Sequence, residues 1–238
     1  MTAVTVKRPG RLARMTRTPE EKPMTPAVAP VAERRRDAER TRAEILDVAT
    51  DEFAERGYSG ARVDEIAART RTTKRMIYYY FGGKEQLYLA VLERAYAQIR
   101  AAERTVDVDH LDPVAALRRL AEVTFDHHAA HPAFIKLVGV ENAQQARHMT
   151  HVARLVDLNS SAVDLLRGVL ERGQRDGTFR TDVDALDVHM LISSFCFFRV
   201  ANRHTFGALF DRDLLDPARR THYRTMLGDL LTGYLKRS

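Results

Sequence analysis

Residues 63–87 read VDEIAARTRTTKRMIYYYFGGKEQL and contain two short helical patterns joined by a polar break. In the first pattern, Val63, Ile66 and Ala67 share one face at the i, i+3, i+4 spacing of a helix that buries one side. The segment 70–73 (TRTT) is a poor helix interior, and its last threonine can accept the backbone N–H groups that open the next helix. This stretch therefore predicts a tight helix-turn-helix.

The second helix of this pair has two unlike faces at about 100° per residue. The inner side holds Thr73, Met76, Ile77 and Tyr80. The outer side holds Lys74, Arg75, Tyr78 and Tyr79. Exposed tyrosine rings between cations are unusual on a protein that has no use for them. Cations and tyrosine hydroxyls bond phosphates, and arginine or lysine can also bond guanine in the major groove. The outer side is therefore a candidate DNA-contacting surface.

The same residues resemble the DNA-binding signature of TetR-type (tetracycline-repressor-like) regulators. The resemblance covers residues 36–90 and rests on Ile66-Ala67, on the run 73–81 and on Lys84-Glu85-Gln86-Leu87. Upstream it includes Thr41-Arg42, Ile45-Leu46, Ala49, Phe53-Ala54 and Gly57-Tyr58. It implies a homodimeric regulator, usually a repressor, that binds a palindromic double-stranded DNA operator. With the exposed face, it gives the expected DNA-contacting residues: Arg62, Thr72, Thr73, Lys74, Arg75, Tyr78, Tyr79 and Lys84.

Two positions depart from the family pattern. Arg71 stands in the turn where the family usually has glycine, so the geometry of this turn is open. Ala61 stands where the family usually has threonine ahead of the first helix of the pair, and alanine cannot cap a helix. We expect Ser59 to cap that helix instead, from a slightly different register.

The fold class predicted for the whole chain is all-α, because no alternating strand pattern and no repeat occurs. We expect a tail over residues 1–32, a three-helix DNA-binding domain over 33–83, and a helical effector-binding and dimerisation domain over 84–238. The first helix spans about 33–56 and stops at Gly57, and a long helix runs from Lys84 to about residue 105. Further helices are expected over 113–125, 132–146, 148–158, 160–175, 185–204 and 217–235.

The first 32 residues are rich in proline and basic residues and lack a helical period, which predicts disorder. Their cations could form an arm that follows DNA. A solvated tail explains the same composition, as does a true start at Met15 or Met24. These alternatives stay open.

The last two predicted helices carry wide apolar stripes. One holds Leu186, Met190, Leu191, Phe195 and Phe198, and the other Tyr223, Leu227, Leu230, Leu231 and Tyr234. Stripes of this width suit an antiparallel four-helix dimer interface, as in the resembled family. The alternative is that both stripes belong to the core of one chain.

The central helices also offer a candidate pocket for a small effector of unknown identity. Segments 134–142 and 195–202 place polar side chains among large apolar ones, a mixture that suits a ligand site. The expected effector-binding residues are Phe125, His128, Leu137, Glu141, Asn142, Phe195, Phe198, Arg199 and Asn202. A helix interior whose polar residues satisfy one another explains the pattern equally well.

Catalytic and metal chemistry find no support in the sequence. The pairs His127/His131 and His148/His151 have spacings that place two imidazoles on one helix face, but no third ligand follows at a diagnostic spacing. The serine pairs lack a nucleophile-elbow pattern, and no glycine-rich phosphate loop occurs. We expect no enzyme activity, no metal and no cofactor.

The composition is that of an ordinary globular protein. Its 238 residues, 45% of them hydrophobic, suffice for one large or two small domains. The single cysteine, Cys196, excludes an intramolecular disulfide. No apolar run approaches the roughly 20 residues that span a bilayer, so we expect no membrane contact and a bacterial cytoplasmic location, on the nucleoid when DNA is bound. The net charge of +6 favours a polyanionic partner.

Two other hypotheses remain at this stage. One is a constitutive DNA-binding architectural protein whose C-terminal half only dimerises. The other is a helical ligand-binding or catalytic protein whose basic face is incidental. An effector screen by thermal shift separates the first from a regulator, because a bound ligand raises apparent stability. The second hypothesis predicts that the protein shows no preference for any operator sequence.

Overall fold

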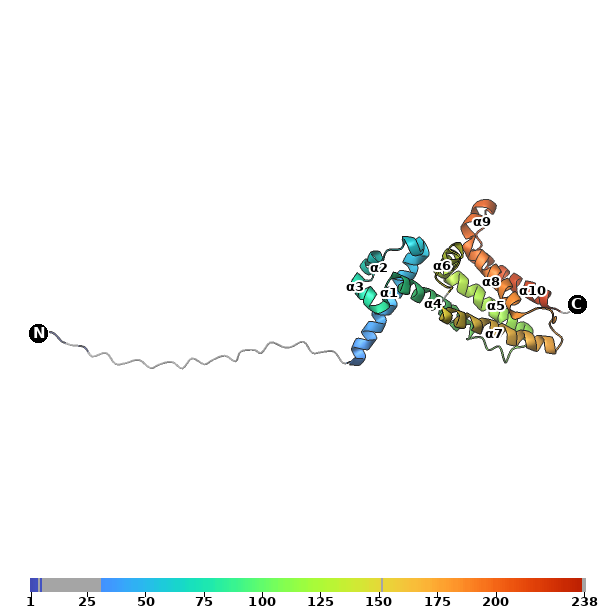
Figure 1. The fold of residues 1–238 in the computed structure, drawn as a ribbon, viewed down its shortest axis with the longest axis horizontal. Helices are drawn as coiled ribbons and strands as arrows, with labels where there is room; N and C mark the ends of the chain where they lie inside the picture. The colour runs from blue at the N-terminus through green and yellow to red at the C-terminus, as the bar shows by residue number, and fades with distance from the viewer. Residues whose placement is uncertain (4, 6–30, 151, 237–238) are drawn as a thin grey trace.

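The computed structural model describes residues 1–3, 5, 31–150 and 152–236. All the secondary-structure elements within these residues are helices, which confirms the predicted all-α class. The elements are α1 Val31–Gly60, α2 Val63–Arg69, α3 Lys74–Phe81, α4 Lys84–Glu103, α5 Pro113–Ala130, α6 Pro132–Ala143, α7 Ala153–Arg175, α8 Ala185–Ala201, α9 Arg203–Phe210, the 3-10 helix η1 Pro217–Arg219 and α10 Arg220–Leu235. Figure 1 shows α1–α3 gathered at one end of α4 and the remaining helices at its other end.

Helix α1 buries Ile45, Leu46, Ala49 and Phe53, which repeat at helical spacing along one face. Its regular part ends at Gly57, as predicted, because this glycine has φ 65° and ψ 176°. A left-handed φ is open to glycine at little steric cost. The chain continues through one more helical turn to Gly60.

The helix-turn-helix forms as the sequence predicts. Helix α2 buries Val63, Ile66 and Ala67, and ends at Arg69 with Thr70 as its C-terminal cap. In the turn, Arg71 has φ 53°, so a non-glycine residue holds the left-handed conformation that glycine adopts most readily. This strain is of the order of 1 kcal/mol.

The prediction that Ser59 caps α2 is wrong. The N-terminal cap is Arg62, which offers no side-chain hydrogen bond to the helix. Instead its backbone N–H donates to the Oε1 atom of Glu52 at 3.2 Å. Glu52 is 3% exposed and also pairs with Arg56 at 3.2 Å and Arg69 at 3.7 Å. A buried carboxylate from α1 therefore bonds the N–H of the cap residue, whereas a capping serine would bond N–H groups of the first turn.

Two of the predicted helix boundaries are wrong. Residues 148–158 and 160–175 were expected to form two helices, but α7 runs unbroken from Ala153 to Arg175. The side chains of Asn159, Ser160 and Ser161 bond carbonyls three or four residues earlier in the same helix, so this polar run does not interrupt it. Likewise, the helix expected over 185–204 ends at Ala201, and α9 follows as a separate helix.

The other predicted starts hold. Asp112 caps α5, its Oδ1 accepting from the N–H groups of Val114 and Ala115, and Pro113 occupies the first turn. Pro132 opens α6 in the same way. At these positions a proline loses no helical hydrogen bond, because the first N–H groups of a helix have no partner within it.

Buried apolar side chains form two clusters. The first joins α1–α3 to α4, α6, α7 and the end of α8, with Phe53, Ile77, Tyr88 and Leu137 among its fully buried members. The second joins α5, α7, α8 and α10 around Leu117, Phe125 and Phe179. Helix α4 contributes no residue to the second cluster, but it packs on α5 and α7. It is thus the element that links the N-terminal helices to the C-terminal ones (Figure 1).

Two sequence-based expectations concern residues that the structure does not describe. Most of the tail over 1–32 lies outside the described residues, and so does His151 of the second histidine pair. Within the described residues, no helix combines the length and apolar character that crossing a bilayer requires.

Candidate nucleic-acid interface and ligand cavities

Helix α3 is fixed on the protein by its inner side. Ile77 is fully buried and Phe81 is 9% exposed. The Thr73 hydroxyl accepts from the N–H of Met76 at 3.2 Å, which confirms the predicted cap. The Arg42 guanidinium lies 4.9 Å from the centre of the Phe81 ring. The helix is therefore held at its N-terminal end by a cap and along its length by the core.

Three of the four residues predicted on the outer side of α3 are exposed and form no ion pair with another described residue. Arg75 is exposed, and Tyr78 and Tyr79 are 40% and 78% exposed. The Lys74 ammonium pairs with Asp64 on α2 at 3.2 Å, so contact with DNA requires exchange of that partner. Met76, placed on the inner side by its spacing, is 37% exposed because the core side of this short helix is narrow.

The three flanking candidates differ in environment. Arg62 is exposed at the start of α2, and Thr72 is half-buried in the turn. The Lys84 ammonium donates to the Ser59 carbonyl at 3.4 Å and lies 4.9 Å from the centre of the Tyr58 ring. Partial burial lowers the pKa of Lys84, and the nearby Glu52 carboxylate opposes that shift. Lys84 thus joins the start of α4 to the end of α1 in this state.

The nine predicted effector residues are not brought together. Phe195, Phe198 and Arg199 line a groove between α8 and α10, and the buried Phe125 lies directly beneath Arg199. His128 lines a separate interior cavity. Glu141 lies where α1, α4 and α6 meet. Of the remaining three, Leu137 is buried in the core, Asn142 is exposed, and Asn202 is the residue between α8 and α9.

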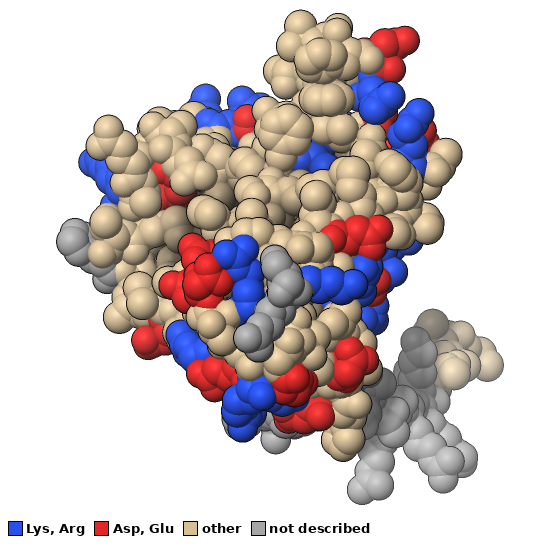
Figure 2. All heavy atoms as spheres, turned by 90° about the vertical axis from the view of Figure 1, so that its right-hand side faces the viewer, with Lys and Arg blue, Asp and Glu red and all other residues tan. Residues whose placement is uncertain are grey.

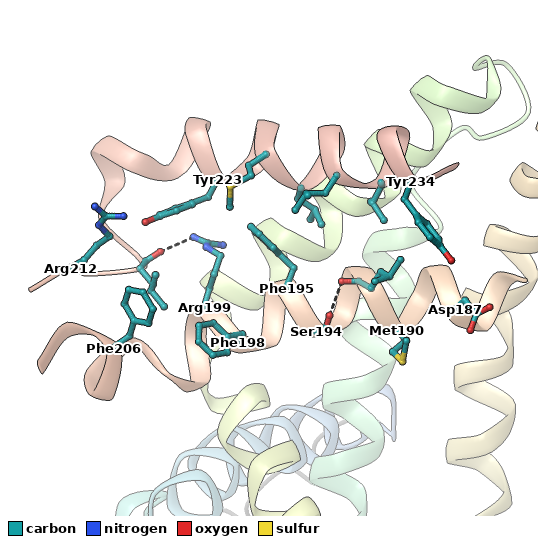
Figure 3. A pocket seen from close by; sticks show the side chains of 16 residues that line it. Asp187, Met190, Ser194, Phe195, Phe198, Arg199, Phe206, Arg212, Tyr223 and Tyr234 are labelled. Atoms are coloured by element: carbon teal, nitrogen blue, oxygen red, sulfur yellow. Dashed lines mark hydrogen bonds between the residues drawn. The ribbon is translucent and has the colours of Figure 1, made fainter. Parts of the chain in front are cut away.

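The groove between α8 and α10 has a volume of about 860 Å³ (Figure 3). Its polar centre is Arg199, which donates to the Leu214 carbonyl at 3.1 Å and lies 3.7 Å from the centre of the Phe125 ring. The face around it exposes apolar side chains from both helices: Leu186, Met190, Phe198, Leu230 and Tyr234. Figure 2, which views the right-hand end of Figure 1, shows α9 projecting at the top as a largely uncharged lobe, and Leu209 and Phe210 of α9 are 75% and 64% exposed.

The interior cavity is smaller, about 380 Å³; five helices line it, and it opens to the surface beside the exposed Met190 and Ser194. Its lining consists of Tyr96 and Arg100 from α4, His128 from α5, Phe134 and Val138 from α6, Asn159 from α7, and His189, Met190, Ser193, Ser194 and Phe197 from α8. Arg100 and His128 are only 5% and 6% exposed. Cavities of this size with a few polar groups among aromatic ones are typical of ligand sites.

Several polar atoms at this cavity lack hydrogen-bond partners. Among the described residues, nothing accepts from Nε or Nη1 of Arg100, and Nδ1 of His128 is also unpartnered. Nη1 lies 3.1 Å from Oε2 of Glu103, which is close enough for an ion pair but outside hydrogen-bonding geometry. Buried polar atoms are nearly always hydrogen-bonded in native proteins, so each exception needs an explanation.

Of this lining, His128 was the only residue among the nine predicted effector contacts, while Phe134, Val138 and Phe197 lie within the two segments predicted to form a pocket. Arg100 carried a usable signal, because it follows Tyr96 by four residues and therefore lies on the same face of its helix. His189 gave none, because its helix is apolar on most of its circumference.

Glu141 belongs to a buried network at the joint between the N-terminal and C-terminal helices. Its Oε1 accepts from the Tyr88 hydroxyl at 2.8 Å and lies 2.9 Å from Nδ1 of His148, and its Oε2 accepts from the His148 N–H at 3.2 Å. The Tyr58 ring, at the end of α1, lies 4.2 Å from the imidazole of His148. Burial, followed by the hydrogen bond to Glu141, raises the pKa of Tyr88.

The histidines of α5 make stability depend on pH. Burial lowers the pKa of His128 to about 4 and, with help from neighbouring histidines, that of His127 to about 3. The unfolded chain takes up these protons near pH 6.5. Between pH 6.5 and 4 the unfolded state therefore binds more protons, and stability falls as pH falls.

We expect the free energy of unfolding, measured with urea, to be about 2 kcal/mol lower at pH 5 than at pH 7.5 for each of these histidines. His128→Gln should reduce this difference, whereas His204→Gln, an exposed position on α9, should not. An identical pH dependence in wild type and His128→Gln would show that this imidazole is not held neutral by burial.

No metal centre is evident: among the described residues, no three His, Cys, Asp or Glu side chains are grouped as a metal ion requires.

Comparison with known proteins places both halves of the chain in one family. The family described as "Bacterial regulatory proteins, tetR family" matches residues 45–91, and "Tetracyclin repressor-like, C-terminal domain" matches residues 113–231. The HTH-type transcriptional repressor NicS of Pseudomonas putida is 37% identical over 204 residues, which are 86% of this chain and 96% of NicS. The HTH-type transcriptional repressor SCO4008 of Streptomyces coelicolor is 36% identical over 139 residues, 58% of this chain and 69% of that protein.

A solved structure is similar over nearly its whole length. The putative transcriptional regulator SCO4942 from Streptomyces coelicolor superposes with a TM-score of 0.62 at 31% identity, covering 83% of this chain and 99% of that one. The helical arrangement in Figure 1 is thus shared with a protein of related sequence.

Proposed function

This chain belongs to the TetR family of bacterial regulatory proteins, and on that premise we propose that it is a repressor that binds a palindromic operator as a homodimer. It is a ligand-responsive, DNA-binding transcriptional regulator and not an enzyme. The relatives named above are repressors, which supports repression over activation. A constitutive architectural protein has no such support.

The observation that carries the DNA-binding proposal is the outer side of α3. Arg75, Tyr78 and Tyr79 project from the outer side of this helix, and its inner side packs against the core. We assign base contacts to Arg75 and Tyr79, and phosphate contacts to Thr73, Tyr78 and Lys84. Arg62, Thr72 and Lys74 complete the proposed surface. The DNA-binding domain is then residues 33–83, and two copies of it lie about one helical turn, ~34 Å, apart on the operator.

Tyr79→Ala should weaken binding to the operator more than binding to nonspecific DNA, because a base contact is lost at each half-site. Lys84→Ala should weaken binding to both and lower the salt dependence, because a phosphate contact is lost. Fluorescence anisotropy on both duplexes at several salt concentrations measures this. Lys136→Ala, an exposed lysine of α6, is the matched control for charge. Equal losses on both duplexes for Tyr79→Ala would remove its base-reading role.

We assign dimerisation to the face formed by α8 and α10. Its five exposed apolar side chains surround the groove that holds Arg199, and a monomer seldom leaves so many large apolar groups contiguous. Pairing with the same face of a second copy forms a four-helix interface and satisfies two-fold symmetry. In this proposal the groove is covered by the partner and is not the effector site.

We assign the effector to the interior cavity lined by α4–α8. Helix α4 lines it through Tyr96 and Arg100, and its N-terminal end carries the DNA-binding helices. On the operator, the two DNA-binding domains are held at the spacing of the half-sites. A ligand that binds better to a conformation in which these domains are further apart shifts the population toward that conformation. The affinity for DNA then falls by the ratio of the two ligand affinities, and a ligand without such a difference changes nothing.

The test of the function is binding to the DNA upstream of the protein's own gene, with a scrambled duplex of equal length as control. We expect a protected palindrome that persists when salt is raised. Equal, salt-sensitive binding to both duplexes would reduce the protein to a nonspecific DNA binder at this locus.

A further inference from the structure

Both polar and apolar side chains line the interior cavity. Arg100, His128, His189 and Ser193 supply the polar groups. Phe134, Val138, Met190 and Phe197 supply apolar surface, and both Tyr96 and His128 meet the Phe134 ring edge to face, at 5.2 and 5.5 Å between centroids. A ligand that fits has an apolar body and a compact polar head.

The charge of the lining selects the sign of that head. Among the described residues that line the cavity, Arg100 is the only one with a fixed charge, and no carboxylate lines it. A cationic ligand would therefore lie beside a like charge and find no carboxylate in the lining to pair with. The imidazole of His128 is neutral at pH 7, since burial lowers its pKa to about 4.

Some of the N–H donors of Arg100 have no hydrogen-bond partner among the described residues. A guanidinium carries five N–H donors, and among the described residues those on Nε and Nη1 make no hydrogen bond. Glu103 balances its charge from 3.1 Å, but Glu103 is not part of the cavity lining. A planar carboxylate is the group whose two oxygens match a guanidinium, and such charge-assisted bonds are about twice as strong as neutral ones.

Resting on the proposed function, we propose that the effector is a small carboxylic acid with an apolar body, bound in the interior cavity with its carboxylate on Arg100 and its body against Phe134, Val138 and Phe197. The imidazole of His128 and the Ser193 hydroxyl line the same cavity and can donate further bonds to the acid.

Isothermal titration with matched pairs tests the head group. Benzoate, phenylacetate, hexanoate and octanoate are each compared with their own primary amide, which keeps the body and removes the charge. We expect at least one acid to bind about tenfold or more tightly than its amide, because a hydrogen bond to a charged group is worth more than a neutral one. If no acid in this panel binds more tightly than its amide, the inference is wrong.

Variants locate the site. Arg100→Gln alone would leave the buried Glu103 carboxylate unpaired, so Arg100→Gln is combined with Glu103→Gln to keep the site neutral. Thermal unfolding checks that the pair folds. We expect the double variant to lose the preference for the acid while Arg199→Gln, the buried arginine of the α8–α10 groove, keeps it. Loss of the preference in Arg199→Gln alone would move the acid to the groove and overturn the proposal.

Operator binding by the same protein samples separates the two proposals. A protein that binds its operator but shows no acid preference keeps its proposed function and refutes the acid. A protein that binds acids as described but no operator keeps the cavity assignment and loses the function as an operator-binding repressor. Where both hold, the preferred acid should release the operator, whereas its amide should do so only at about tenfold higher concentration.

Discussion

Leu230→Asp is expected to convert the dimer to a monomer at micromolar concentration. Leu230 is 57% exposed in one chain and lies on α10 beside the exposed Met190 and Tyr234 of the same face. In a two-fold interface the new carboxylate is buried twice, once in each copy. With an unpaired buried charge costing several kcal/mol, we expect at least about 4 kcal/mol, or roughly a thousandfold rise in the dimer dissociation constant.

Sedimentation equilibrium measures this effect, and operator affinity should fall with it, because one head then reads only one half-site. Val156→Asp is the matched control: Val156 is 67% exposed on α7, so the same charge is added to an apolar residue of similar exposure outside the α8–α10 face. A Leu230→Asp protein that remains dimeric would place the interface on another surface.

Glu141→Leu is expected to cost about 3–5 kcal/mol of folding stability, because it leaves the buried Tyr88 hydroxyl and the His148 donors without an acceptor. Glu141 is 1% exposed and Tyr88 is fully buried, so water does not readily replace the lost bonds. The free energy of unfolding in urea gives the magnitude.

A double-mutant cycle with Tyr88→Phe shows whether the loss comes from this network. In the Glu141→Leu background the hydroxyl has no partner left, so removing it should cost less than in wild type, or even stabilise. The affinity for an acid ligand should be unchanged in Glu141→Leu, since Glu141 does not line the interior cavity. Unchanged stability together with lost ligand binding would instead make Glu141 an effector contact, as its sequence neighbourhood first indicated.

The joint around Glu141 also gives the proposed switch a physical connection. Tyr58 lies near the end of α1, Tyr88 lies in the first turns of α4, and His148 follows α6. The Glu141 carboxylate bonds Tyr88 and His148, and His148 packs on Tyr58, so this network connects the segments that must move if the DNA-binding domains move apart. Packed, hydrogen-bonded joints of this kind favour discrete arrangements over continuous bending. A ligand that displaces α4 near Tyr96 and Arg100 acts on the same helix that carries Tyr88.

Local patterns in the sequence were sufficient for the helix-turn-helix. The buried positions Val63, Ile66 and Ile77 and the Thr73 cap depend only on residues three or four apart, so periodicity identified them. Where a local signal was ambiguous, the prediction failed. Asn159-Ser160-Ser161 suggested a break, but their side chains bond within α7 and the helix continues. Ser59 was a suitable cap by residue type, but α2 begins at Arg62, whose N–H donates to Glu52 of α1.

The sequence by itself determined the all-helical class, the exposed side of α3 and the apolar stripes of α8 and α10, because each follows from which side of one helix is polar. Only the tertiary structure decided which buried sides meet. It brings Arg100, His128 and His189 from three helices into one cavity and leaves Arg199 in a separate groove. Helical periodicity encodes the direction of a side chain around its own axis, whereas partners across the core are set by the packing of distant segments, which no local pattern contains.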